Sequence, residues 1–229
     1  MIDIHAHILP AADDGSKDLS QSLEMLFEEE RQGVTDIVLT PHYRADYLTD
    51  KDELTAKFEE LKKAAAENGV KSRLYLGQEI FVFDGIVDLL KQGKVLPING
   101  TNYVLIEFSA VKYADIPETV YTLSTKGYLP IVAHLERYAY ADLDVAREVK
   151  ETGGLIQVNA GSFCGKLKRL YKRKVRELIK DGLVDFVASD VHYSRNNYMK
   201  EAYGAVAKKF GKSVAEQLFT INAEKLLIH

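Results

Sequence analysis

The chain opens with Met1-Ile2-Asp3-Ile4-His5-Ala6-His7, a stretch that combines a β-strand pattern with two histidines two residues apart. Successive side chains of a strand point to opposite faces, so His5 and His7 project to the same side. Ile2 and Ile4 then project to the other side. Because two imidazoles aimed at one point need a group to bind, we expect this first strand to form one wall of a binding site.

Short apolar, β-branched runs recur along the chain and predict seven strands, at about 2–6, 35–40, 73–79, 103–108, 130–134, 155–159 and 184–189. Their near-continuous hydrophobicity is typical of parallel strands that are buried on both faces. Six of these seven strands end in a residue type that binds metals.

Helical periodicity fills the segments between the strands. Helices are expected at about 19–33, 50–69, 84–92, 117–127, 141–152, 167–181, 195–210, 213–218 and 222–228. No Pro- or Ser-rich linker and no repeat interrupts this pattern, which favours one domain over residues 1–229. Regular β-α alternation predicts an α/β fold, either an open sheet or a closed barrel. Only a closed or nearly closed barrel brings six strand ends together, so we expect a distorted (β/α)7 barrel.

Composition narrows the class of protein. A net charge of −4 gives no reason to expect a nucleic-acid partner. No apolar run is long enough for membrane insertion, and a candidate ligand at residue 5 leaves no room for a signal peptide. The single cysteine, Cys164, excludes an internal disulfide framework and a zinc-thiolate site. We therefore expect a cytoplasmic protein.

The candidate metal ligands are imidazoles and carboxylates near predicted strand ends: His5, His7, Asp14, His42, Glu79, Glu107, His134, Asp190 and His192. One histidine at a strand end is usually structural, and a lone H-x-H triplet is a weak signal. Asp190-x-His192 repeats the same-face geometry on the last strand, however, which favours a genuine cluster. Mixed nitrogen and oxygen donors suit manganese, iron or zinc. Nine donors are too many for one ion and fit two or three, as in a metal-dependent hydrolase.

These motifs resemble the polymerase-and-histidinol-phosphatase (PHP) family, whose opening H-x-H and D-G signature is matched by His5, His7 and Asp14-Gly15. Over residues 1 to about 227, the sequence is similar to the manganese-dependent tyrosine phosphatases of Gram-positive capsule and exopolysaccharide clusters. The segments that carry this resemblance are 1–7, 13–15, 30–34, 40–42, 105–109, 133–138, 157–159 and 188–192.

The resemblance implies a distorted (β/α)7 barrel with a three-ion Mn²⁺ site. Its first ion would be held by His5, His7, Glu79 and Asp190. Glu79 would bridge to a second ion, completed by Glu107 and His134, and the third would lie between Asp14, His42 and His192. Such a centre generates a metal-bridging hydroxide, which we expect to attack phosphorus directly without a phospho-enzyme.

Three arginines are candidates for binding the phosphate oxygens. Arg137 lies three residues after His134, while Arg44 and Arg195 follow His42 and His192. For each arginine the alternative is a solvated residue at the rim of the site. Four tyrosines near the ligands could stack on a phosphotyrosine ring or be ordinary exposed loop residues: Tyr43, Tyr138, Tyr140 and Tyr193.

Two further features leave alternatives open. Cysteine-dependent tyrosine phosphatases use a C-x5-R loop, but the sixth residue after Cys164 is Leu170, so Cys164 is expected to be a loop or core residue. Residues 166–176 contain seven basic side chains in eleven positions. They form either a solvated helix face or a docking strip for a phosphorylated tail or anionic surface.

The resemblance implies a protein-tyrosine phosphatase whose partner is the phosphorylated tail of a bacterial tyrosine kinase that regulates polysaccharide synthesis. It also implies that homo-oligomers can form, although no interface is legible in the sequence. The alternatives are a small-molecule phosphatase such as histidinol phosphatase, a PHP-type nuclease, and a non-catalytic binding subunit. The intact ligand set argues against the last, and the acidic net charge argues against the nuclease.

Overall fold

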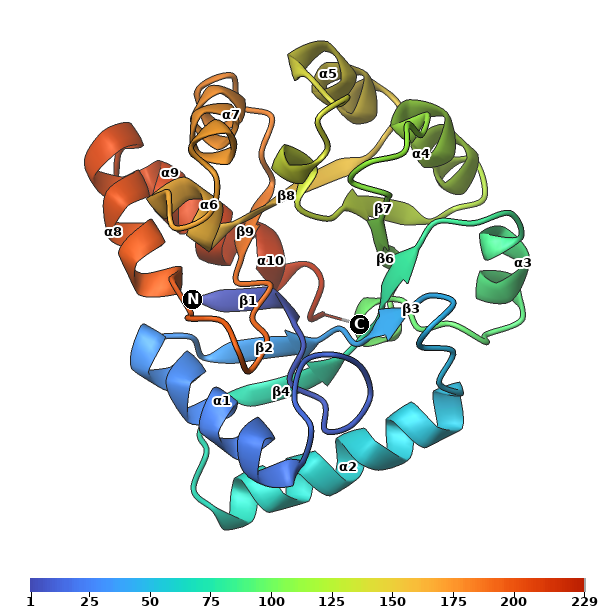
Figure 1. Ribbon diagram of the computed structural model, residues 1–229, viewed down its shortest axis with the longest axis vertical. Helices are drawn as coiled ribbons and strands as arrows, with labels where there is room; N and C mark the ends of the chain where they lie inside the picture. The colour runs from blue at the N-terminus through green and yellow to red at the C-terminus, as the bar shows by residue number, and fades with distance from the viewer. Residues whose placement is uncertain (229) are drawn as a thin grey trace.

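The computed structural model describes residues 1–228; His229, to which the sequence assigns no role, lies outside the described residues. Figure 1 shows a curled inner layer of strands with helices around its outside. The strands are β1 (Ile2–Ala6), β2 (Asp36–Leu39), β3 (His42–Tyr43), β4 (Arg73–Leu76), β5 (Glu79–Phe81), β6 (Tyr103–Glu107), β7 (Leu129–Val132), β8 (Leu155–Asn159) and β9 (Phe186–Ala188).

The strands pair in parallel, in the orders β1-β2-β4 and β3-β5-β6-β7-β8-β9. The predicted strand at 73–79 is in fact two, β4 and β5, separated by Gly77 and Gln78. Close packing explains the break, because a Cβ on Gly77 would lie 3.1 Å from the Ile98 Cα. The Gln78 side chain also turns aside, accepting a hydrogen bond of 2.8 Å from the Leu96 amide.

The first and last strands lie side by side, so the sheet curls back on itself. Ala6 and Val191 form a parallel β-bridge, and the His7 amide donates to the Val191 carbonyl at 3.0 Å. The Asp190 amide donates to the His5 carbonyl at 2.9 Å. This curled parallel sheet fits the expected α/β class, while the closed seven-stranded barrel stays a prediction.

The longer helices match the sequence pattern closely. The helices are α1 (Leu19–Gln32), α2 (Lys51–Glu67), α3 (Ile86–Lys91), α4 (Ile116–Ser124), α5 (Leu143–Glu151), α6 (Ala160–Cys164), α7 (Arg169–Lys180), α8 (Met199–Phe210), α9 (Lys212–Glu216) and α10 (Asn222–Glu224). Asp50 is the N-cap of α2, as expected, and its carboxylate accepts from the Asp52 amide at 2.8 Å. Within residues 1–228, no helix is both long and apolar enough to cross a membrane.

The C-terminal helices differ from the prediction. Helix α9 continues through a π-helical stretch, Gln217–Ile221, into α10, which ends at Glu224 rather than running to residue 228. Beyond it, Leu226 is fully buried in an apolar cluster with Ile2, Ile4 and Leu105. The chain leaves the helix because this burial draws Leu226 onto the inner face of the sheet. Helix α6 was not predicted, and it is short and buried.

A buried carboxyl pair joins β1 to α1. Glu29 is fully buried beside the buried Asp3 carboxyl, and Asn197 Nδ2 donates to Glu29 Oε1 at 2.6 Å. Burial, followed by the negative charge of Asp3, raises the pKa of Glu29 well above its usual value. Folded Glu29 therefore keeps a proton that the unfolded chain releases above a pH of about 4.3.

This proton makes stability depend on pH. A carboxyl whose pKa is raised by folding loses stability as pH rises from the unfolded pKa toward the folded one. Replacing Glu29 by Gln supplies an N–H donor to Asp3 without titrating. We expect Glu29→Gln to raise the melting temperature at pH 8 by about 2–4 °C, with the gain vanishing near pH 4. Thermal unfolding at both pH values measures this, with the exposed Glu24→Gln as control; equal destabilisation at both would contradict it.

Candidate metal centre

All nine predicted ligands converge on one pocket at the carboxyl-terminal side of the sheet. His5 lies on β1 with His7 just after it, His42 and Glu79 begin β3 and β5, and Glu107 ends β6. His134 follows β7, Asp190 and His192 follow β9, and Asp14 comes from the loop before α1. The five histidines are almost fully buried, whereas the Asp14 side chain is 42% exposed.

Glu79 is the centre of this arrangement. Its Oε1 lies 2.8 Å from His134 Nε2 and 3.3 Å from His5 Nε2. Its Oε2 lies 2.8 Å from His42 Nδ1 and 3.4 Å from His7 Nε2. One buried carboxylate therefore contacts four imidazoles, and His134 Nε2 also lies 3.6 Å from Glu107 Oε1.

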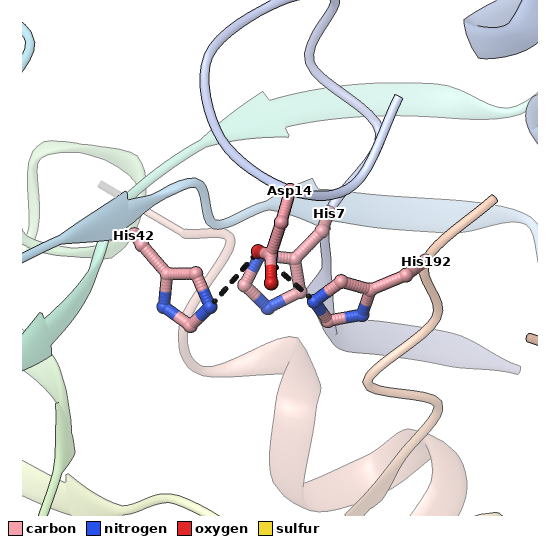
Figure 2. A group of neighbouring side chains, drawn as sticks. All are labelled: His7, Asp14, His42 and His192. Carbon is pink, nitrogen blue, oxygen red and sulfur yellow. Dashed lines mark ion pairs between the residues drawn. The ribbon is translucent and has the colours of Figure 1, made fainter. Parts of the chain in front are cut away.

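A second group forms at the open side of the pocket, where Asp14 lies between two imidazoles (Figure 2). Asp14 Oδ1 is 3.4 Å from His42 Nε2 and 3.5 Å from His192 Nε2. The His7 ring stacks on His192 with centroids 4.1 Å apart. His7 thus joins this group to the one beneath it.

Three overlapping sets have donor atoms within 4.8 Å of one another: His7, Asp14, His42 and His192; His5, His7 and Asp190; and His42, Glu79 and Glu107. These sets share His7 and His42. The family resemblance implies an assignment of the ligands to three ions that overlaps with these sets but is not identical to them. That assignment therefore stays a prediction.

The hydrogen-bond partners of His5 and His7 indicate which ring nitrogen of each is free to bind a metal. His5 Nδ1 lies 3.2 Å from the amide oxygen of Gln157, and His7 Nδ1 lies 2.6 Å from Asp13 Oδ2. Both partners can only accept, so each Nδ1 carries the proton and each Nε2 presents a lone pair. These two Nε2 atoms face each other at 3.1 Å. They repel unless a proton or metal ion lies between them.

Unpartnered polar atoms point to the same requirement. Among residues 1–228, Glu107 Oε2 and His192 Nε2 are buried without a hydrogen-bond partner. Leaving such atoms unpaired is costly. Bound divalent cations would satisfy them, and a mixed nitrogen and oxygen donor set suits manganese, iron or zinc. The residues present therefore fit a multi-ion site.

The pKa values of His192 and Glu107 are shifted in opposite directions. Burial and the positive charge of His7 lower the pKa of His192 to about 3, which keeps its imidazole neutral and able to bind a metal. Burial and the negative charge of Glu79 raise the pKa of Glu107 to about 8. A cation between these two carboxylates would remove the repulsion that raises the Glu107 pKa.

Asp13 is a functional residue that the sequence did not identify. Besides His7, its carboxylate accepts from the Gly15 amide at 2.9 Å and the His42 amide at 2.9 Å. Burial alone would raise the Asp13 pKa, but the His7 charge and these hydrogen bonds outweigh it and hold the pKa well below its ordinary value. Gly15 allows the turn, because a Cβ there would lie 2.0 Å from the His7 carbonyl oxygen.

A second supporting layer comes from β8. The Gln157 amide oxygen also accepts from the His134 backbone N–H at 2.8 Å, and Gln157 Nε2 donates to Asn159 Oδ1 at 2.9 Å. Asn159 Nδ2 in turn donates to Asp190 Oδ2 at 2.7 Å. The signal was available, because Gln157 and Asn159 are polar residues two apart on an otherwise apolar buried strand.

Two ligands hold strained backbone conformations. His134 has φ 35° and Asp190 has φ 51°, in the left-handed region that non-glycine residues rarely adopt. The hydrogen bond from the His134 amide to Gln157, and the one from the Asp190 amide to the His5 carbonyl, hold these turns in place. Strain of this kind typically concentrates at functional sites.

The three predicted arginines all border the pocket. Arg137 Nη1 lies 3.2 Å from Asp190 Oδ2, and Arg195 Nη1 lies 3.5 Å from Asp190 Oδ1. Arg44 Nη2 lies 3.8 Å from Asp14 Oδ2, with its guanidinium over the Tyr47 ring. Each arginine is partly exposed, so each can reach an anion that enters the pocket.

The tyrosines near the ligands differ in burial and in hydrogen-bond partners. Tyr138 is fully buried and its hydroxyl accepts from the Phe108 amide at 3.0 Å, so its proposed stacking on a substrate ring was wrong. Tyr140 is hydrogen-bonded to the Ser109 carbonyl, and exposed Tyr193 to Glu24. Another ring beside a ligand is Tyr47, which stacks on His42 with centroids 6.1 Å apart and which the sequence did not single out.

Cys164 lies at the end of α6, half-buried, outside the ligand cluster. Burial, followed by the nearby Glu201 charge, raises the pKa of its thiol to about 11. A nucleophilic cysteine needs a lowered pKa. The raised pKa of Cys164 is therefore the opposite of what a catalytic thiol needs.

A curled parallel sheet with imidazoles and carboxylates clustered at its strand ends is the arrangement of a metal-dependent hydrolase. The family model for capsular polysaccharide synthesis proteins, CpsB/CapC, matches residues 1–228, and the chain belongs to this family. It is 34% identical to tyrosine-protein phosphatase YwqE of Bacillus subtilis, over 99% of this chain and 91% of that protein. It is 35% identical to tyrosine-protein phosphatase CpsB of Streptococcus agalactiae, over 99% and 98% respectively.

Comparison with solved structures leads to the same kind of protein as comparison of sequences. The chain superimposes with a TM-score of 0.92, at 34% identity and over 99% of its length and 94% of the other chain, on a crystal structure from work on YwqE of Bacillus subtilis and CpsB of Streptococcus pneumoniae, described as metal-dependent tyrosine phosphatases. A lactonase from Listeria monocytogenes matches with a TM-score of 0.64 at 13% identity, covering 99% of this chain and 94% of that one, which is a likeness of fold alone.

The role of Asp13 can be tested through metal affinity. We expect Asp13→Asn to weaken metal binding by roughly 10- to 100-fold. The neutral amide of Asn replaces the negatively charged carboxylate that accepts the His7 Nδ1 proton and orients the ring. Titration calorimetry, or the metal concentration that gives half-maximal activity, measures the change. The exposed Asp84→Asn serves as the matched control, and an Asp13→Asn protein with wild-type metal affinity would rule out this role.

Proposed function

We propose that this protein is a metal-dependent protein-tyrosine phosphatase that hydrolyses phosphotyrosine on a bacterial tyrosine kinase controlling capsular or exopolysaccharide synthesis. The observation that carries the proposal is a cluster of eight nitrogen and oxygen donors in overlapping sets, with His134 hydrogen-bonded to Glu79 beside them and three arginines at the border. The named tyrosine phosphatases to which the chain is similar over nearly its full length support the choice of reaction.

The metal would be Mn²⁺, as two or three ions held by the nine ligands, with Fe or Zn as alternatives. Divalent ions in such a site lower the pKa of water to near neutrality and neutralise the charge of the phosphate. The protein's own contribution is to orient the histidine rings toward one another. Asp13 and Gln157 do this by fixing the Nδ1 protons of His7 and His5.

The arginines would bind the phosphate oxygens that face away from the ligands. Arg137 is best placed, because its Nη1 already hydrogen-bonds to a buried carboxylate of the cluster. An entering phosphate can take a bidentate hydrogen-bond pair from such a guanidinium. Arg195 and Arg44, from two other sides of the pocket, would complete the anion site.

The leaving group favours an aromatic ester. A phenol has a pKa of about 10, so phenolate departs with less help than an alkoxide. The pocket is open at the Asp14 side, which suits a tyrosine carried on a polypeptide. A small-molecule phosphatase such as histidinol phosphatase would share the ligands, and a nuclease is less favoured by a net charge of −4.

Three finer features belong to the same proposal: a single domain over residues 1–229, a distorted (β/α)7 barrel, and a cytoplasmic location. The bridge between Ala6 and Val191 supports closure of the sheet, because it joins the first and last strands. The cytoplasmic side of the membrane is where a bacterial tyrosine kinase would present its phosphorylated tail.

A substrate panel tests the reaction. Mn²⁺-loaded protein is assayed with a phosphotyrosine peptide, histidinol phosphate and single-stranded DNA, each with and without a chelator. We expect metal-dependent hydrolysis of the peptide, with kcat/KM at least about tenfold above that for histidinol phosphate. Strong histidinol phosphate turnover with negligible phosphotyrosine activity would favour the small-molecule alternative instead.

Two substitutions separate the metal mechanism from a cysteine mechanism. His5→Ala removes a ligand at the buried end of the cluster, and phosphatase activity should fall by roughly 1,000-fold or more. Cys164→Ser should leave kcat within about twofold, since the thiol is outside the cluster and its pKa is raised. Steady-state assays of both proteins decide the question, and a large loss in Cys164→Ser alone would revive the cysteine mechanism.

A further inference from the structure

Three hollows lie end to end from the metal centre along α7. The first, of about 600 Å³, is lined by the site residues Arg137, Asp190 and Arg195 and also by Lys166 and Lys168. The second shares Arg137, Lys168 and Tyr171 with the first. The third shares Leu170, Arg173 and Glu177 with the second. Shared lining residues therefore place the three hollows next to one another, and we call them together the groove.

Positive charge predominates along this groove, although Glu136, Asp142 and Asp144 also line the second hollow. Helix α7 carries Arg169, Lys172, Arg173, Arg176 and Lys180 at spacings that put them on one face. Its opposite face is buried through Val175, Leu178 and Ile179. We call the cations along the groove the basic track: Lys166, Lys168, Arg169, Lys172, Arg173, Arg176, Lys180 and Lys209 of α8.

The basic track is costly to the helix that carries it. Like charges four residues apart destabilise a helix, and the first turn of α7 contains no acidic residue. Internal neutralisation is sparse: Glu201 lies 3.5 Å from Lys166, and Glu177 lies 3.7 Å from Arg173. Within residues 1–228, no carboxylate pairs with the other six cations of the basic track. The charge is left available to an external anion.

The surroundings suit a polypeptide better than a flat surface. Leu167 and Leu170 lie beside the cations and are 50% and 54% exposed, so apolar contacts are available between the charges. Helix α7 has 12 residues and spans about 18 Å, the length of roughly five or six residues of extended chain. A groove of this length that begins at Arg137 can be followed by the chain that leads away from a bound phosphotyrosine.

We propose that the basic track binds an Asp- and Glu-rich stretch of the substrate polypeptide, adjacent in sequence to the phosphotyrosine. This inference rests on the proposed phosphatase function and adds to it a determinant of substrate choice. The phosphate enters the metal centre between Arg137 and Arg195, and the acidic residues lie along the first hollow and α7. The exposed cations select acidic substrates mainly through KM, because they lie beyond the reacting atoms.

The test compares two phosphotyrosine peptides that differ only in flanking residues, one acidic and one neutral, with Mn²⁺-loaded full-length protein. The variant is Lys168→Gln/Arg173→Gln, because each of these residues lines two of the three hollows. The control is Lys62→Gln/Lys63→Gln on α2, which has the same change in charge and lies across the molecule from α7 (Figure 1).

Wild-type protein should prefer the acidic peptide in kcat/KM by about tenfold, and the double variant should lose about fivefold of this preference through a higher KM. The control should keep the wild-type preference. Raising the salt concentration from 50 to 500 mM should erode the preference in wild type more than in the variant. A single Lys168→Gln substitution, with an intermediate loss, keeps the test valid if the double variant folds poorly.

Each other outcome overturns the inference. Equal turnover of both peptides by wild type, or an equal loss in the control, removes the basic track as a determinant while leaving the phosphatase function intact. No hydrolysis of either peptide rejects the phosphatase function itself. Binding to phosphatidylserine vesicles that the double variant loses, with the peptide preference retained, would assign the basic track to a membrane surface.

Discussion

The contact on which the site depends is the burial of the Glu79 carboxylate among four imidazoles. Water cannot solvate these groups, so their charges and lone pairs must be satisfied by one another or by bound cations. The curled sheet brings together the ends of strands that are distant in sequence. Several of these ends contribute a nitrogen or oxygen donor to the buried cluster.

Around the ligands lies a layer of residues that decide where protons sit. Asp13 and Gln157 each accept an Nδ1 proton, which turns the Nε2 lone pairs of His7 and His5 toward each other. Asn159 continues this layer to Asp190. The Gln157 amide oxygen that orients His5 also holds the left-handed turn at His134, so backbone strain and ligand orientation share one support there. The pocket is thus largely organised before any ion enters it.

Much of this could be predicted from the sequence, because strand periodicity and ligand chemistry are local. The H-x-H pattern predicts that His5 and His7 point to one place, and their Nε2 atoms do lie 3.1 Å apart; apolar runs located most strands. What could not be predicted depended on contacts distant in sequence. Gly77 breaks a strand because Ile98 packs against it, and Tyr138 is buried because its hydroxyl has a partner on another loop. Asp13 lay next to the predicted ligand Asp14, but no one-dimensional pattern distinguishes a metal ligand from its hydrogen-bonding neighbour.

The C-terminal segment packs against the sheet well away from the exposed side of the ligand cluster. Leu226 is fully buried in one apolar cluster with Ile2 and Ile4 of β1 and Leu105 of β6. Asp14 is the most exposed of the nine ligands, with a side chain that is 42% exposed. A substrate would therefore reach the ligands from the Asp14 side, and inorganic phosphate and the dephosphorylated chain would leave by that side as well. On a long polypeptide, turnover would then depend on how fast that chain withdraws.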